Sequence, residues 1–287
     1  MHLPVVVGVD GSEPSLRAVD RAADEATLRA VPLRIVHAYR WDRYEGAALA
    51  REIGLPSASV TPDDILVAAG RRARRHHPDL AVTLEAVAEE PEYVLLREAR
   101  HASAVIVGTR GRGEVADLLL GSVSLSVATA ATCPVFVIRG DDGNRAAEGR
   151  HGRVVVGVSD APTAAVRFAC EEARRRGAAL DAIRAWRCPT RETADHPLLT
   201  GTPERLHEER AAEELEAALA DAPADVRLRR HTVEGPARRV LLTASQEADL
   251  LVVGRHRPGQ YGHRLGRIAH TLLHHSACPV AVVPDTP

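Results

Sequence analysis

Short apolar runs alternate with longer amphipathic stretches along this chain. In its first part, nearly continuous apolar runs predict strands at residues 4–9, 32–38, 81–87, 104–108 and 134–138. Between these runs, apolar positions recur at helical spacing and predict helices at about 14–30, 62–77, 91–101 and 122–130. Strands that alternate with helices indicate an α/β fold, with a parallel sheet covered by helices on both faces.

The same pattern occurs twice. Val154 to Ser159 repeats Val5 to Asp10, Leu251 to Gly254 repeats the strand that ends at Gly108, and Cys278-Pro279-Val280 repeats Cys133-Pro134-Val135. We therefore predict two tandem domains, each a doubly wound five-stranded parallel sheet, over residues 1–140 and 152–287. The segment from Gly140 to Gly152 is polar and glycine-rich, which is typical of a linker.

Composition limits the class of protein. The formal net charge is −2, aromatic residues make up 3%, and no apolar run is long enough to span a membrane. Met1 to Pro4 lead directly into a predicted strand, so we expect no secretory signal. We therefore expect a cytoplasmic protein with neither a nucleic-acid nor a membrane partner.

The cysteines and basic residues exclude two kinds of binding site. The four cysteines lack the paired spacing of metal ligands, so we expect buried free thiols at Cys133, Cys170, Cys188 and Cys278. Apart from histidine, every basic residue is arginine, and the absence of lysine excludes a Walker-type phosphate lysine.

A glycine-rich segment between two apolar runs predicts a phosphate site. Gly108-Thr109-Arg110-Gly111 follows one predicted strand, and Gly121-Ser122 begins the next predicted helix. Glycine permits positive φ and close approach to a ligand, and the free N–H groups and dipole of a helix start favour an anion. Arg110 and Arg112 either reach the phosphates or are solvated loop residues. The alternative for the whole segment is an ordinary glycine-rich turn.

Asp10 ends the first predicted strand. If the first and fourth strands are neighbours, Asp10 faces the loop after Gly108, because ligands of doubly wound sheets bind beyond the carboxyl ends of the strands. There its carboxylate is suited to accept hydrogen bonds from ribose hydroxyls. The alternative is a turn or helix-capping role before Pro14.

The spacing G-x2-G-x9-G-[S/T] resembles the nucleotide-binding signature of the universal stress protein family. Val5 to Ser12 resembles the first strand and acidic turn of that family, and Cys133-Pro134-Val135 resembles the start of its last strand. The resemblance implies the adenine nucleotide alpha hydrolase-like fold with strand order 3-2-1-4-5. It also implies ATP as ligand, with Mg held mainly by the phosphates, and a role as a sensor or regulator in stress adaptation.

The resemblance also extends the predicted site. It places His37-Ala38 against the adenine, Gly8 close to the nucleotide, and Val123 beside the phosphates after Ser122. The complete predicted nucleotide site comprises Gly8, Asp10, Ala38, Gly108, Thr109, Arg110, Gly111, Arg112, Gly113, Gly121, Ser122 and Val123. Members of this family pair across the last strand, so the resemblance implies an internal pseudo-dimer of the two domains and further assembly into a homodimer.

The second copy departs from this pattern. Ser159 replaces Asp10, Arg257 replaces Gly111 and Arg267 replaces Ser122, although Gly266 is retained. One interpretation is a degenerate scaffold without a ligand. The other is an altered anion pocket built from Arg255, Arg257, Arg264 and Arg267.

Catalytic motifs are missing. The sequence has no nucleophile elbow or Ser-His-Asp order, and a phosphoryl-transfer enzyme needs metal ligands and a positioned base as well as a cradle. We expect binding without fast turnover; the alternatives are a slow ATP hydrolase and a nucleotide-independent partner-binding module. His270 and His274 are one helical turn apart, but exposed helix histidines are favoured over a metal site.

Overall fold

The computed structural model describes residues 3–39, 61–109, 120–139, 151–159, 164–188, 203–255 and 265–284. The chain divides into two compact units, Met1–Ile138 and Arg139–Pro287. The predicted linker lies mostly outside the described residues. Each unit is built around five parallel strands.

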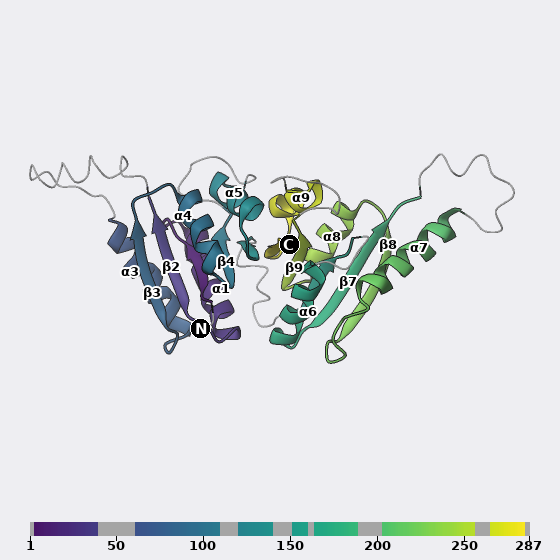
Figure 1. The fold of residues 1–287 in the computed structure, drawn as a ribbon, viewed down its shortest axis with the longest axis horizontal. Helices are drawn as coiled ribbons and strands as arrows, with labels where there is room; N and C mark the ends of the chain where they lie inside the picture. Colours follow the sequence, from purple (N-terminus) through teal and green to yellow (C-terminus); the bar gives the residue numbers. More distant parts are fainter. Residues whose placement is uncertain are drawn as a thin grey trace, which may run out of the picture. The chain divides into compact units, whose positions relative to one another are not determined.

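The first unit has the predicted strand order. Its strands pair in the order β3-β2-β1-β4-β5, which confirms the order 3-2-1-4-5. Its elements, most of them labelled in Figure 1, are in chain order β1 (Val5–Gly8), α1 (Glu13–Leu28), β2 (Leu33–Ala38), α3 (Pro62–His76), β3 (Val82–Val87), α4 (Pro91–Glu98), the 3-10 helix η1 (Ala99–His101), β4 (Ala104–Gly108), α5 (Ser122–Ala130) and β5 (Val135–Ile138).

The second unit repeats this order. Its strands pair as β10-β9-β6-β7-β8, so β6 and β9 are the central neighbours, as β1 and β4 are in the first unit. The elements are β6 (Arg153–Gly157), α6 (Ala164–Arg176), β7 (Ala179–Trp186), α7 (Pro203–Ala218), β8 (Leu228–Glu234), α8 (Ala237–Ser245), β9 (Leu250–Gly254), α9 (Arg267–His275) and β10 (Val280–Val283).

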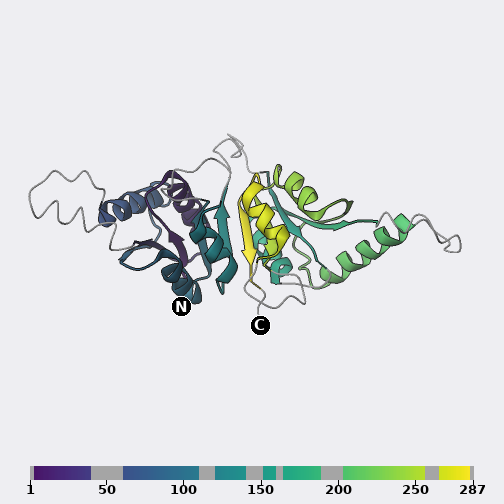
Figure 2. The ribbon, with the colours of Figure 1, turned by 90° about the horizontal axis from the view of Figure 1, so that it is seen from above.

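Helices cover both faces of the sheet in the first unit (Figure 2). α1 packs with α3 over one face, and α4 packs with α5 over the other. The central strands are therefore enclosed on both sides, and Val5, Val6, Val7, Ala104, Val105 and Ile106 are completely buried. Continuous apolar runs are typical of such strands, because both of their faces lie away from water.

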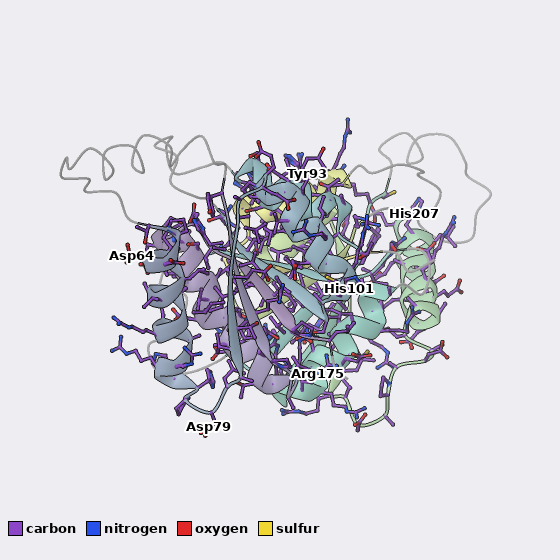
Figure 3. All side chains as sticks on the ribbon, turned by 60° about the vertical axis from the view of Figure 1, so that its left-hand side comes forward. Asp64, Asp79, Tyr93, His101, Arg175 and His207 are labelled. Atoms are coloured by element: carbon purple, nitrogen blue, oxygen red, sulfur yellow. The ribbon has the colours of Figure 1, made fainter. Side chains whose placement is uncertain are left out.

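Capping residues fix where the helices begin. Thr61 precedes α3 and forms a reciprocal capping box with Asp64, while Pro62 occupies the first helical turn. Acidic residues fill that first turn and basic residues fill the last, in keeping with the helix dipole. In Figure 3, Asp64 lies near the start of α3 and Asp79 beyond its end.

A buried glutamate near the end of the first helix recurs in both units. Glu25 of α1 is 1% exposed and pairs with Arg21 at 2.9 Å. Glu172 of α6 is equally buried and pairs with Arg176 at 2.6 Å. Burying a carboxylate is unfavourable unless it is paired, so these arginines are needed to keep each glutamate in the core.

The cysteines are free thiols, as predicted. Cys133, Cys170 and Cys278 are buried, and burial raises the pKa of Cys133 to about 12. Cys188 does not fit the expectation of burial, because it follows the end of β7 and is partly exposed.

Gly108 is needed where β4 meets the start of α1. A Cβ at Gly108 would lie 2.7 Å from the carbonyl oxygen of Pro14, which is backbone. A Cβ at Gly8 would also be crowded, at 2.8 Å, but by the flexible end of Leu95. Because backbone cannot rotate away as a side chain can, Gly108 is the more constrained of the two positions.

We predict that Gly108→Ala lowers the free energy of unfolding by about 1–3 kcal/mol, the usual range for overpacking, and that Gly8→Ala lowers it less. Thermal unfolding of the full chain without nucleotide measures both. Equal losses for the two variants would contradict the packing role of Gly108.

Candidate functional site

The ends of β1 and β4 meet at the point where the strand order reverses. Val7 of β1 pairs with Ile35 of β2 on one side and with Ile106 of β4 on the other. The predicted neighbourhood of the first and fourth strands is therefore confirmed. Asp10 and Thr109 follow these two strands at the same edge of the sheet, the usual ligand position in doubly wound folds.

The start of α5 is held against the end of β4 by two hydrogen bonds. The N–H of Gly121 donates to the carbonyl of Thr109 at 2.7 Å. The buried hydroxyl of Ser124 donates to the carbonyl of Gly108 at 2.6 Å. These bonds fix the first turn of α5 beside the strand ends.

That first turn is suited to bind an anion. α5 begins at Ser122 as predicted, and Gly121 at the N-cap supplies no side chain to cap it. The first N–H groups of a helix have no partner within the helix, so they are the donors an anion can use. Arg110, Gly111, Arg112 and Gly113 lie outside the described residues, so their predicted contacts stay predictions.

Gly108 does not use the positive φ that glycine permits. This residue continues β4 and is not among the glycines with positive φ, whereas Gly11 has a φ of 82° in the turn before α1. The reason for glycine at position 108 is the close approach of Pro14 described above. The glycine therefore brings the start of α1 close to the end of β4.

Asp10 organises the turn that follows β1. Its Oδ1 accepts hydrogen bonds from the N–H of Ser12 at 3.0 Å and from the hydroxyl of Ser12 at 2.6 Å. Ser12 is in turn the N-cap of α1, and its side chain accepts from the N–H of Ser15. The structure thus shows the turn role that was the alternative to ribose binding. Since a carboxylate has about four acceptor positions, both roles are compatible.

The last two residues of β2 differ in exposure, because His37 is buried and Ala38 is partly exposed. His37 is 3% exposed, and its Nδ1 lies 2.7 Å from the carbonyl of Val9, to which it donates as Nδ1–H. Ala38 is partly exposed at the last position of the strand. Of the two residues assigned to the adenine by resemblance, Ala38 is therefore the one with accessible surface, and a nucleotide contact at Ala38 or Gly8 stays a prediction.

Glu92 is a member of this region that the sequence did not single out. It lies in the first turn of α4, and its Oε1 is 3.5 Å from the exposed hydroxyl of Ser122. The neighbouring Tyr93 is 74% exposed (Figure 3). The signal available in sequence was Pro91 followed by an acidic residue, which marks a helix start but not its position beside α5.

The second unit repeats the backbone of this region with different side chains. Gly266 at the start of α9 donates its N–H to the carbonyl of Arg255 at 3.0 Å, as Gly121 does to Thr109. Arg184 of β7 stands where His37 stands in β2, and it donates to the carbonyl of Val158 at 3.3 Å. Arg257 and Arg264 of the predicted anion pocket lie outside the described residues.

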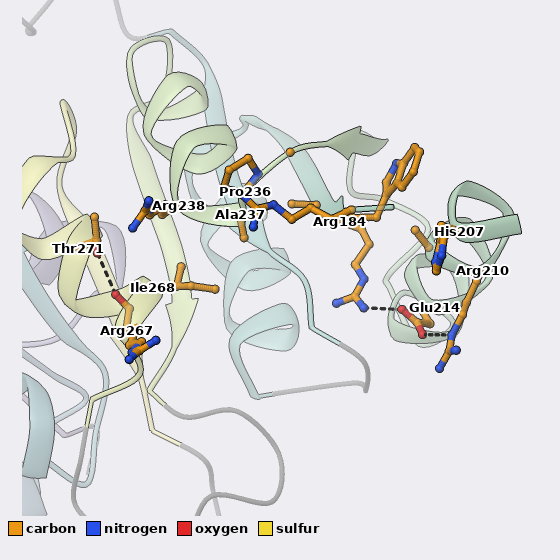
Figure 4. A pocket seen from close by; sticks show the side chains of 15 residues that line it. Arg184, His207, Arg210, Glu214, Pro236, Ala237, Arg238, Arg267, Ile268 and Thr271 are labelled. Atoms are coloured by element: carbon orange, nitrogen blue, oxygen red, sulfur yellow. Dashed lines mark hydrogen bonds and ion pairs between the residues drawn. The ribbon is translucent and has the colours of Figure 1, made fainter. Parts of the chain in front are cut away.

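A cavity of about 640 Å³ lies beyond the strand ends of the second unit (Figure 4). It is lined by the end of β7, by α7, and by the first turns of α8 and α9. Arg267 belongs to this lining, as the altered-pocket interpretation expects. The sequence did not single out the other arginines of the lining, Arg184, Arg187, Arg210 and Arg238.

Neither a metal cluster nor a membrane helix is found in the part of the chain that the structure describes. No group of three or more His, Cys, Asp or Glu side chains there is placed to hold a metal. The rings of His270 and His274 are 4.5 Å apart on α9. No described helix combines the length and the apolar character that crossing a membrane requires.

Comparisons with known proteins agree on one family. The model of the Universal stress protein family matches residues 1–139 and 151–284. The universal stress protein Rv2005c of Mycobacterium tuberculosis (strain ATCC 25618 / H37Rv) is 33% identical over 300 residues, 97% of this chain and 96% of the relative. The crystal structure of a universal stress protein from Archaeoglobus fulgidus DSM 4304 matches 99% of this chain and 98% of its own, with a TM-score of 0.62 and 19% identity, a likeness in fold.

A third comparison concerns half of the chain. A universal stress protein whose crystal structure was determined in complex with cAMP matches 48% of this chain and 97% of its own, with 30% identity and a TM-score of 0.37. The bound cAMP is a property of that protein.

Proposed function

Because this chain belongs to the Universal stress protein family, we propose that its first unit binds ATP and that the bound state acts as a sensor or regulatory signal in stress adaptation. The observation that supports this proposal best is the first turn of α5. Its N–H groups begin directly beside the end of β4, without a capping side chain.

The phosphates are proposed to bind at this turn. Ser122 and Val123 supply free backbone N–H groups, while the N–H of Gly121 donates to the carbonyl of Thr109 and holds this turn against the end of β4. The segment Arg110 to Gly113 completes the predicted cradle. Mg is proposed to be held mainly by the phosphates, where it would neutralise part of their charge.

The nucleoside is proposed to lie over the ends of β1 and β2. Asp10 follows β1 with its carboxylate at the strand end, where it can accept from ribose hydroxyls while it keeps the hydrogen bonds from Ser12. Ala38 offers a small, partly exposed surface at the end of β2 for the adenine. In this arrangement, one nucleotide extends from the ends of β1 and β2 to the start of α5.

The proposal is binding without fast turnover. Transfer of a phosphoryl group needs a positioned base to activate the attacking oxygen. Of the two described carboxylates at this edge, Asp10 is assigned to the turn and the ribose, and Glu92 lies beside the hydroxyl of Ser122 at the helix start, so neither is assigned to activate an attacking oxygen. This supports a protein that holds its nucleotide and presents the bound state to another molecule.

We predict that Ser122→Glu weakens ATP–Mg binding at least about tenfold, because a carboxylate at the helix start repels phosphate. Position 122 is exposed, and the favourable interaction of the new charge with the helix dipole offsets its repulsion from Glu92, so we expect the fold to be preserved. Ser126→Glu on the same helix is the matched control. Calorimetric titration of ATP–Mg into the full chain measures both, with thermal unfolding as a check on folding. Unchanged affinity in Ser122→Glu would contradict phosphate binding at α5.

The substitution Asp10→Asn tests the ribose-binding role of Asp10 separately from its role in the turn. Asparagine keeps an oxygen that can accept from Ser12, so we predict an unchanged melting temperature. A hydrogen bond to a charged group contributes about 1.5–3 kcal/mol. We therefore expect the uncharged amide to lower the affinity for ATP about tenfold or more. Unaltered ATP affinity would restrict Asp10 to the turn.

A further inference from the structure

The cavity of the second unit is strongly basic. Five arginines contribute to its lining and Glu214 is the single carboxylate there among the described residues. Figure 4 labels four of these arginines, with Arg184 and Arg210 beside Glu214 on one side and Arg238 and Arg267 on the other. Such a concentration of guanidinium groups around one hollow is the arrangement that recognises phosphate.

Arg238 and Arg267 occupy unfavourable positions for a cation. Arg238 lies in the first turn of α8 and Arg267 is the first residue of α9. A positive charge near a helix start opposes the dipole unless an anion is close by. Within the described part of the chain, neither arginine forms a hydrogen bond or ion pair through its side chain, and no side chain caps either helix.

These two arginines reverse the charge found in the first unit. Leu95 and Leu241 are equivalent, because each would meet a Cβ on the glycine that ends the first strand of its unit, at 2.8 and 2.9 Å. Counting back from these leucines, Arg238 stands where Glu92 stands. Arg267 likewise replaces Ser122. Two helix starts that carry one acidic and one neutral side chain in the first unit therefore carry two cations in the second.

On the other side of the cavity, Glu214 forms ion pairs with Arg184 and Arg210. Arg184 donates to Glu214, and Nε of Arg210 lies 3.0 Å from the other carboxylate oxygen. Arg184 and Glu214 are only 17% and 21% exposed, so their pairing is partly shielded from water. An anion that enters the cavity therefore competes with Glu214 for the same guanidinium groups.

We infer that this cavity binds a small molecule with two or more phosphate groups, held by arginine side chains instead of a glycine-rich cradle. Because arginines line the cavity from two sides, a ligand with more than one phosphate group can contact both groups. All of the lining residues belong to the second unit, so the site is separate from the proposed ATP site of the first unit.

The test uses the full chain carrying Ser122→Glu, so that the first unit contributes little phosphate binding. Inorganic tripolyphosphate is titrated calorimetrically at low ionic strength into this protein and into a derivative with Arg238→Gln and Arg267→Gln. Both arginines are exposed, so their replacement leaves the fold intact. Arg239→Gln is the matched control, because Arg239 is an exposed neighbour on α8 outside the lining.

We expect tripolyphosphate to bind, the double substitution to weaken it at least about tenfold, and Arg239→Gln to change it little. We also expect Glu214→Gln to strengthen binding, because it removes the competing carboxylate. Absence of binding, or equal weakening by Arg239→Gln and by the double substitution, would overturn the site. Unchanged or weaker binding in Glu214→Gln would overturn the assignment of Arg184 and Arg210 to it.

ATP in the same Ser122→Glu background distinguishes the source of the phosphates. Affinity equal to that of tripolyphosphate supports recognition of the phosphate chain alone, and tighter binding of ATP supports a nucleotide as the natural ligand. Orthophosphate binding as tight as tripolyphosphate would overturn the requirement for two phosphate groups.

Discussion

The close approach of α1 to the end of β4 is the constraint on which the site in the first unit depends. The backbone of Pro14 lies so near Gly108 that no side chain fits there. The same stretch of β4 accepts the hydroxyl of Ser124 and, through Thr109, the N–H of Gly121. The starts of α1 and α5 are thereby brought to one edge of the sheet. Without this contact, the turn at Asp10 and the start of α5 would not lie together at one edge of the sheet.

The two units share one backbone arrangement at the fourth strand and the following helix, but the side chains around it differ in charge. Gly121 and Gly266 make the same hydrogen bond to the residue after the fourth strand of their units. The side chains around that bond differ, because Ser122 in one unit is replaced by Arg267 in the other. In the first unit, backbone N–H groups are the available donors for an anion. In the second, guanidinium groups occupy the helix starts instead.

The sequence predicted the elements well because local patterns determine them. Continuous apolar runs identified the central strands, and Gly121-Ser122 marked the start of α5. The strand order came from the family resemblance, and the structure confirms it. Arg267 was recognised as a departure from the motif, since it could be compared with Ser122 position by position.

The rest of the site depends on contacts between distant segments. Glu92 and Arg238 lie on helices that a sequence pattern defines, but their neighbours belong to other helices. Nothing in a local pattern shows that Glu92 meets Ser122, or that Arg238 lines the same cavity as Arg184. The role of Gly108 could not be predicted for a similar reason, because glycine permits both positive φ and close packing, and only the position of Pro14 decides between them.

Hydrogen–deuterium exchange of the full chain, with and without ATP–Mg, tests the central claim most directly, since it observes backbone N–H groups themselves. We predict slower exchange at the free N–H groups of the first turn of α5, from Ser122 to Ser124, and in the turn from Asp10 to Glu13. The buried middle of β4 should be unaffected. Slower exchange confined to other segments, with no change at the start of α5, would contradict a phosphate site built from the backbone of the first unit.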